Sequence, residues 1–192
     1  VLAGISWVLE RKEQLGIRIL NISVGACSKR GMSENSALVK GVNRAWDAGL
    51  VVVVAAGNNG PRTMSITTPG ISRKVITVGC SDDDREVLVG GNRMVDYSGR
   101  GPTAACICKP DLVAPGCSVV SCSSRADKYT IKSGTSMSTP IVSGAVALLL
   151  ERFPDMSNKD VKLRLRESSV DIGLPRNQQG WGLLDVGKMI GK

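Results

Sequence analysis

The sequence predicts an α/β fold built on a parallel sheet. Residues 17–24, 50–56 and 75–78 are short runs rich in β-branched side chains, which is typical of strands buried on both faces. Segments with helical spacing of apolar residues precede the first run and separate it from the second. Strand, helix and strand with short links form a βαβ unit, whose right-handed crossover makes the strands parallel.

The first half of the chain contains two predicted helices. Residues 1–15 carry apolar side chains at helical spacing, and Gly16 then predicts a helix end. Between residues 33 and 49, Val42 and Trp46 mark the apolar face of the second helix. Each helix is followed by one of the predicted strands.

Irregular structure and a hairpin are predicted next. Residues 87–104 are a Gly-rich loop with short extended pieces. Residues 118–121 and 129–132 are extended segments that can pair as a hairpin.

Helices are predicted to dominate the C-terminal part. The apolar run 141–150 predicts a buried helix that ends near Pro154. Ser157 and Asp160 have the spacing of a capping box, so we expect a helix there, although residues 161–165 alternate as a strand would.

Composition is that of a globular protein with one domain. The chain has 192 residues, 42% hydrophobic and 22% charged, which suffices for one sizeable core. Its net charge is +8, but the basic residues are scattered and aromatic residues are few, so we expect a solvated basic surface rather than a nucleic-acid site. No run is long enough to span a membrane, and we expect no membrane partner.

Residues 132–140 carry the chemistry. Small polar residues precede Pro140 and the apolar helix, so Ser136 is predicted at a helix N-terminus, where the macrodipole favours negative charge. That position suits a nucleophilic hydroxyl whose attack creates an oxyanion. A capping serine is the alternative.

Four segments in order resemble the subtilisin-like serine proteases, or subtilases. Residues 134–140 resemble the nucleophile motif, apart from Ser138 where Ala is usual, and 21–25 resemble the substrate-binding strand. Residues 55–60 resemble the oxyanion-hole segment, and 109–116 the segment before the catalytic hairpin. The resemblance implies a three-layer α/β/α fold with a mostly parallel sheet. It also implies that residues 1–192 are the C-terminal part of a single subtilase catalytic domain, incomplete because the N-terminal part is missing.

The resemblance also assigns site residues. Ser136 would be the nucleophile and the amide of Asn58 an oxyanion donor, although an Asn-Asn-Gly turn explains Asn58 equally from the sequence alone. Small residues would let a substrate strand pair with the cleft, and Thr67 would form the pocket floor, suiting a neutral or apolar side chain. The expected cleft residues are Ser23, Val24, Gly25, Ala55, Ala56 and Gly57.

The chain contains no histidine, although the family triad needs one together with an Asp. We therefore expect a serine endopeptidase that acts on polypeptides through an acyl-enzyme on Ser136, with Asp and His on an absent upstream segment. This chain alone is expected to be inactive and to need that segment or to self-associate. The alternatives are a pseudoprotease scaffold acting by binding, and a nucleotide-binding domain. The second lacks both G-x-G-x-x-G and a Walker lysine.

The six cysteines do not have the spacing of a small disulfide scaffold. We expect free thiols and a reducing compartment, the bacterial cytoplasm, with secretion as the alternative. Cys106-Ile107-Cys108 is too short for a C-x₂-C metal knuckle, and no calcium loop is present, so no metal or other cofactor is expected in this chain. The resemblance allows calcium in a full-length protein.

Overall fold

The structure is a computed structural model that describes residues 1–26, 34–124 and 128–191. The helices are α1 (Leu2–Leu15), α2 (Ala37–Asp47), α3 (Thr135–Arg152), α4 (Asn158–Ser168), α5 (Arg176–Gln179) and α6 (Val186–Ile190). The strands are β1 (Ile19–Ile22), β2 (Val51–Ala55), β3 (Ile76–Cys80), β4 (Val87–Val89), β5 (Asn92–Met94), β6 (Leu112–Ala114), β7 (Val119–Cys122) and β8 (Tyr129–Lys132).

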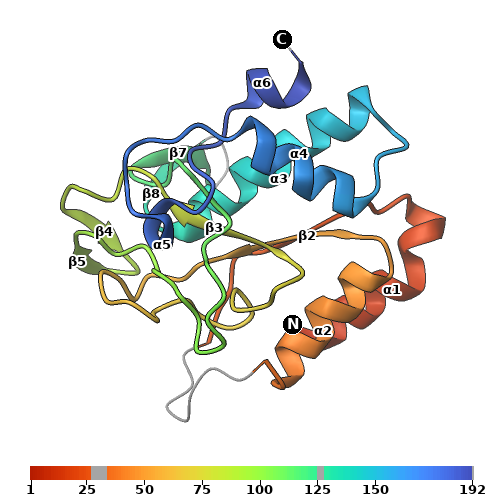
Figure 1. Cartoon of the computed structure of the whole chain (residues 1–192), viewed down its shortest axis with the longest axis horizontal. Helices are drawn as coiled ribbons and strands as arrows, with labels where there is room; N and C mark the ends of the chain where they lie inside the picture. The colour runs from red at the N-terminus through yellow and green to blue at the C-terminus, as the bar shows by residue number, and fades with distance from the viewer. Residues whose placement is uncertain (27–33, 125–127, 192) are drawn as a thin grey trace.

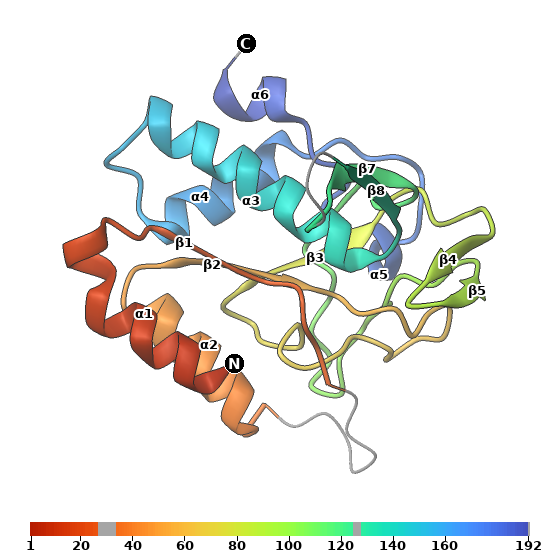
Figure 2. The ribbon, with the colours of Figure 1, turned by 180° about the vertical axis from the view of Figure 1, so that it is seen from behind.

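A four-stranded parallel sheet forms the middle layer, in the order β1-β2-β3-β6. Helices α1 and α2 cover one face, and α3, with α4 and α6 beyond it, covers the other (Figures 1 and 2). Every residue of β2 and β3 is buried, which explains why both strands lack charged residues and β2 is wholly apolar. The α/β class, the parallel sheet and the three layers are therefore confirmed.

Local signals account for the helix ends. Gly16 closes α1 in the left-handed conformation, with φ of 62°. At the start of α4, Ser157 accepts a hydrogen bond from the Asp160 amide, and the Asp160 side chain accepts one from the Ser157 amide. The capping box thus predicts this helix correctly against the strand-like alternation that follows it.

Two features of the fold go beyond the sequence prediction. The three-residue strand β6 was not predicted, because so short a segment shows no periodicity. The extended pieces expected within 87–104 pair as the hairpin β4–β5, which turns at Gly90 and Gly91, both with positive φ. The predicted pairing of 118–121 with 129–132 is present as the hairpin β7–β8.

The two outer edges of the sheet differ. On β6, the Val113 amide donates to the Gly182 carbonyl (2.9 Å) and the Val113 carbonyl accepts from the Leu184 amide (2.9 Å), so the chain itself covers that edge. Strand β1 lies at the opposite end, and within the described residues no strand pairs with its outer side. One edge is thus closed and the other is open.

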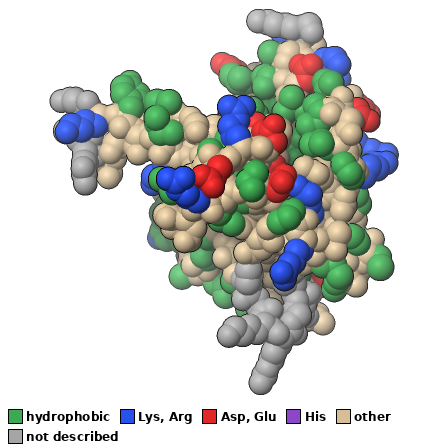
Figure 3. Space-filling model, turned by 90° about the vertical axis from the view of Figure 1, so that its left-hand side faces the viewer, with side chains coloured by type: hydrophobic (Ala, Val, Ile, Leu, Met, Phe, Trp, Pro, Cys, Tyr) green, Lys and Arg blue, Asp and Glu red, His purple; other side chains and the backbone are tan. Residues whose placement is uncertain are grey.

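Apolar side chains are exposed on the hairpin β7–β8. It projects from the body of the molecule in Figure 3, and Val120, Tyr129 and Ile131 are each more than half exposed.

No helix in the described ranges combines the length and the apolar character needed to cross a membrane.

A buried ion pair lies where β3 meets β6. The Asp111 carboxylate accepts hydrogen bonds from the Thr77 amide (2.7 Å) and from the fully buried Lys109 ammonium group. Lys109 also donates to the Val75 carbonyl (3.0 Å). These bonds satisfy charges that would be costly to bury alone. The Asp111 carboxylate therefore serves to hold the fold together.

Candidate active site

Ser136 is the second residue of α3, directly after Gly134 and Thr135. The first four amides of a helix have no intrahelical acceptor, so the Ser136 amide is available at the positive end of the macrodipole. The Ser136 hydroxyl donates a hydrogen bond to the Ser23 carbonyl at 2.9 Å. The serine therefore joins the start of α3 to the segment that follows β1.

Asn58, which follows β2, is oriented by Thr135. Its Oδ1 accepts hydrogen bonds from the Thr135 amide and from the Thr135 hydroxyl, both at 3.0 Å. Because only the carbonyl end can accept, the NH₂ end points away from these two bonds. A Cβ at Gly134 would stand 3.2 Å from Nδ2, so the glycine leaves room for this amide group.

A cavity of about 310 Å³ lies in front of these groups. It brings together seven of the nine residues that the sequence predicted. The residues that line it are Ser23, Gly25, Ala55, Gly57, Asn58, Asn59, Thr67, Thr135 and Ser136.

Val24 and Ala56 are not among the residues that line the cavity, although their neighbours are. Successive residues of an extended segment point to opposite sides, and each of these two stands between lining neighbours. Val24 is 53% exposed and points outward, whereas Ala56 is fully buried behind the cavity wall. The Ala56 carbonyl still acts at the site, because it accepts hydrogen bonds from the Thr67 amide (2.8 Å) and hydroxyl (3.2 Å).

Thr67 stands between the two walls of the cavity. A Cβ added at either Gly25 or Gly57 would overlap the Thr67 side chain. Gly57 also has φ of 95°, a conformation that strains other residues. The small residues at these positions thus make space for Thr67, and none of the described residues that line the cavity is ionisable.

Thr135 and Asn59 line the cavity although the sequence gave them no role. Both lie inside motifs that were recognised, next to Ser136 and Asn58. Thr135 accepts a hydrogen bond from the Gly57 amide (3.2 Å) in addition to orienting Asn58, so it holds both walls together. The signal that the sequence offered for Thr135 was its hydroxyl, which stands directly beside Ser136 in the recognised motif.

The cavity has hydrogen-bond donors of the kind that stabilise an oxyanion, but the chain has no histidine to act as a general base. Two donors, the Asn58 amide and the Ser136 backbone N–H, stand next to the Ser136 hydroxyl. The hydroxyl proton is directed to a backbone carbonyl, which cannot remove it. Histidine, which the chain lacks, is the residue that acts as the base in the subtilase triad.

Comparison with known proteins gives consistent results. A family model described as the subtilase family matches residues 1–182. Serine protease AprX of Bacillus subtilis is 37% identical over 186 residues, covering 88% of this chain and 42% of that protein. Subtilisin DY of Bacillus licheniformis is 33% identical over 188 residues, covering 97% of this chain and 60% of that protein.

Solved structures agree with the sequence comparison. The structure of sphericase superposes with a TM-score of 0.77 at 30% identity, over 96% of this chain and 62% of that one. The S218A mutant of the PatA protease domain gives a TM-score of 0.71 at 27% identity. The chain therefore spans between two fifths and two thirds of the length of the relatives described here.

Proposed function

The chain belongs to the subtilase family of serine peptidases, and from this premise we propose that it is the nucleophile-bearing part of a serine endopeptidase domain. Ser136 would attack the scissile carbonyl and form the acyl-enzyme. The observation that supports this most is the convergence of the Ser136 hydroxyl, the Ser136 amide and the oriented Asn58 amide on one cavity. A structural serine would need neither donor.

Substrate would bind as an extended strand against the backbone of residues 23–25 and of 55–57. Small residues there allow close backbone approach. The side chain before the scissile bond would enter the cavity toward Thr67. Because the lining is neutral, we expect a neutral or apolar side chain to be preferred over a charged one.

The missing base would come from outside this chain. When Ser136 attacks, its proton must pass to a general base and later to the leaving amine. We propose that a His and an Asp on an upstream segment of a longer protein supply this function. Two observations support the proposal: the chain has no histidine, and the relatives extend well beyond the matched region.

The isolated chain should accordingly lack useful peptidase activity, and its partner would be the upstream segment or a second copy at the open β1 edge. The second candidate function is a pseudoprotease that binds polypeptides without cleaving them. The Ser136 hydroxyl bond to a carbonyl, and the lack of a base, are the observations in its favour.

Fluorophosphonate labelling followed by intact-mass spectrometry distinguishes these functions. In the longer protein that contains the upstream segment, we expect one adduct per chain, lost in Ser136→Ala. The isolated chain should not be labelled at a comparable rate. A folded longer protein that stays unlabelled would instead support the pseudoprotease.

The proposal extends to the cellular compartment of the protein and to calcium binding. Cys80, Cys106, Cys108, Cys117 and Cys122 are free thiols, which supports a reducing compartment such as the bacterial cytoplasm. The sixth cysteine, Cys27, lies outside the described residues. Any calcium would bind in the longer protein, as the resemblance to subtilases implies.

A further inference from the structure

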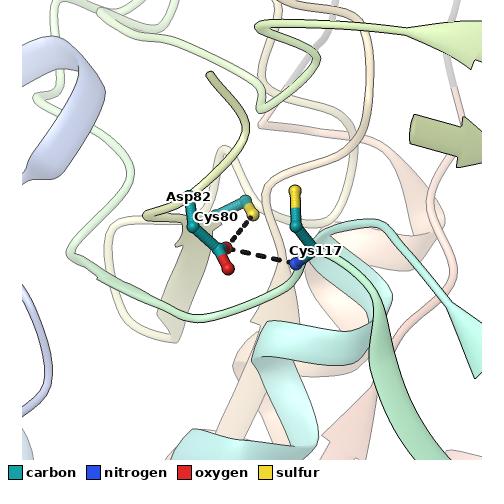
Figure 4. A group of neighbouring side chains, drawn as sticks. All are labelled: Cys80, Asp82 and Cys117. Carbon is teal, nitrogen blue, oxygen red and sulfur yellow. Dashed lines mark hydrogen bonds between the residues drawn. The ribbon is translucent and has the colours of Figure 1, made fainter. Parts of the chain in front are cut away.

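Two cysteines and an aspartate lie close together outside the cavity that contains Ser136. Cys80 ends β3, Asp82 follows two residues later, and Cys117 lies in the loop after β6 (Figure 4). The Cys80 thiol donates to the Asp82 carboxylate at 3.1 Å. The two sulfur atoms and a carboxylate oxygen all lie within 4.8 Å of one another.

The carboxylate is held in place by the backbone. Asp82 Oδ1 accepts hydrogen bonds from the amides of Gly116 (2.7 Å) and Cys117 (3.1 Å). Such bonds from surrounding groups are what orients a ligating carboxylate in metal sites. The site is therefore preorganised on one side.

Two further hydroxyl groups border the cluster. The fully buried Tyr97 hydroxyl lies 3.2 Å from Cys80 Sγ and 3.1 Å from Cys117 Sγ. Ser138 is also fully buried, and its hydroxyl has no hydrogen-bond partner among the described residues. Its Oγ and Cys80 Sγ both pack against Gly116, where an added Cβ would overlap the hydroxyl and stand 2.8 Å from the sulfur.

From this geometry we propose that Cys80, Asp82 and Cys117 bind a thiophilic divalent cation of the Zn²⁺ type. Two sulfurs and a carboxylate are among the ligands that Zn²⁺ takes in proteins, with bonds of about 2.0–2.3 Å. In a tetrahedral site two sulfurs bonded at about 2.3 Å lie about 3.8 Å apart, so ligand atoms that now lie within 4.8 Å of one another would have to close by at most about 1 Å. The Tyr97 hydroxyl or a water molecule would complete the coordination, and the partly exposed Cys117 gives the ion a way in.

Binding would release protons and transfer no electrons. Each thiol loses one proton to solvent as its sulfur bonds the cation, and the carboxylate joins without further change. A disulfide between Cys80 and Cys117 would instead need an oxidant, and the Tyr97 hydroxyl contacts both sulfurs where they would have to meet.

The position of this site gives it a structural consequence. The Gly116 carbonyl, one residue before Cys117, accepts a hydrogen bond from the Gly134 amide at 2.9 Å. Gly134 in turn precedes the helix start that carries Ser136. The cation would therefore brace the loop beneath the nucleophile.

Metal titration of the reduced protein tests the site. With Co²⁺ as the probe, we expect one equivalent per chain, a thiolate-to-metal charge-transfer band in the near ultraviolet, and displacement by Zn²⁺. Cys117→Ser and Asp82→Asn should each weaken Zn²⁺ affinity at least about tenfold, as loss of a group that holds a metal commonly does. The matched controls Cys106→Ser and Cys122→Ser, at exposed cysteines, should leave the affinity unchanged.

The outcomes are separable. Circular dichroism of each variant checks that lost binding is not lost folding, and Asn at position 82 can still accept the two backbone amides. Ser136→Ala should keep full binding, so the metal site stands or fails independently of peptidase activity. No charge-transfer band, a band abolished by Cys106→Ser, or a mass two protons lower with Cys80 linked to Cys117 would each overturn the proposal.

Discussion

Asn58 shows how much of the site depends on single atoms. Its Oδ1 is occupied by the amide and the hydroxyl of Thr135, and only for that reason is its NH₂ group directed away from the helix. The sequence motif identifies Asn58 as a candidate donor. Which end of the amide faces the cavity follows only from the contact with Thr135, a residue to which the sequence assigned no role.

Asn58→Asp separates donation from positioning. Aspartate keeps an acceptor for both Thr135 bonds but has no N–H to give to an oxyanion. In the longer, active protein, kcat should fall about 10²–10³-fold with little change in KM, the magnitude known for such a donor in subtilisin. Thr135→Ser, which keeps the hydroxyl, is the control. A loss of less than about tenfold on steady-state peptide hydrolysis would remove Asn58 from the oxyanion hole.

Lys162 on α4 is largely buried, and its ammonium group donates hydrogen bonds to the carbonyls of residues 73–75 at 2.9–3.0 Å. It lies over the rings of Trp46 and Trp181, at 5.7 and 6.0 Å, and 3.6 Å from Asp111. Burial lowers its pKa to about 8, against the attraction of Asp111 and with a further small contribution from Lys109. The charged form is therefore less favourable in the folded chain than in the unfolded one.

Stability should consequently rise between about pH 8 and pH 10.5, because there the unfolded lysine binds a proton that the folded one has released. Lys162→Met should remove a rise on the order of 2–3 kcal/mol from the pH profile of the unfolding free energy. Lys159→Met, at an exposed lysine of the same helix, should leave it intact. Identical profiles for Lys162→Met and the parent in urea titrations would contradict this assignment.

At the level of elements, the sequence predicted what local patterns determine. Long apolar periodicity found α1, α2 and α3, and the capping box found α4. Strand β6 was not found because its three residues gain their conformation from β3 on one side and residues 182–184 on the other. Most residues that line the cavity were likewise predicted one by one. Val24 and Ala56 are not among them, because alternate residues of an extended segment face opposite sides and the side that faces the cavity depends on where the segment lies.

Helix α4 provides a test of local determination. Ser157→Ala removes the acceptor for the Asp160 amide and should lower the unfolding free energy by about 1 kcal/mol. Ser124→Ala, at an exposed serine outside any helix, is the matched control. Equal stability of the two variants in denaturant unfolding would mean that tertiary packing alone sets the start of α4.

For the whole molecule, how widely the residues of a site are spread along the chain determines whether the sequence can predict that site. Residues from four separate segments line one cavity, and three of these segments lie within stretches whose resemblance to subtilases predicted that they would meet. The cluster of Cys80, Asp82 and Cys117 could not be predicted in this way. Cys80 and Asp82 are close in sequence, but Cys117 lies 35 residues further on, and only the pairing of β3 with β6 brings it to them.

The open β1 edge leads to a prediction about association. The Arg18 carbonyl accepts from the Val51 amide (2.9 Å), so the alternate residues Ile19 and Asn21 turn their backbone groups outward. Unpaired backbone groups of this kind favour pairing with another strand. We expect concentration-dependent self-association of the isolated chain in sedimentation velocity, and its suppression by the upstream segment.

Asn21→Pro should weaken this association, because proline removes an outward amide, whereas Asn21→Ala removes only the side chain and should not. If both variants associate as the parent does, the contact lies elsewhere, for example on the exposed hairpin β7–β8.

The covered β6 edge then limits what can be assembled. A sheet that is open on both sides can add copies without end, as fibres do. Within the described residues the four-stranded sheet has one open edge, so two copies that meet there cover the open edge of each sheet and leave none for a third. Such pairing is self-complementary and closes by two-fold symmetry. The backbone hydrogen bonds that residues 182–184 make to β6 would therefore fix the stoichiometry at two and keep an incomplete domain from growing into a filament.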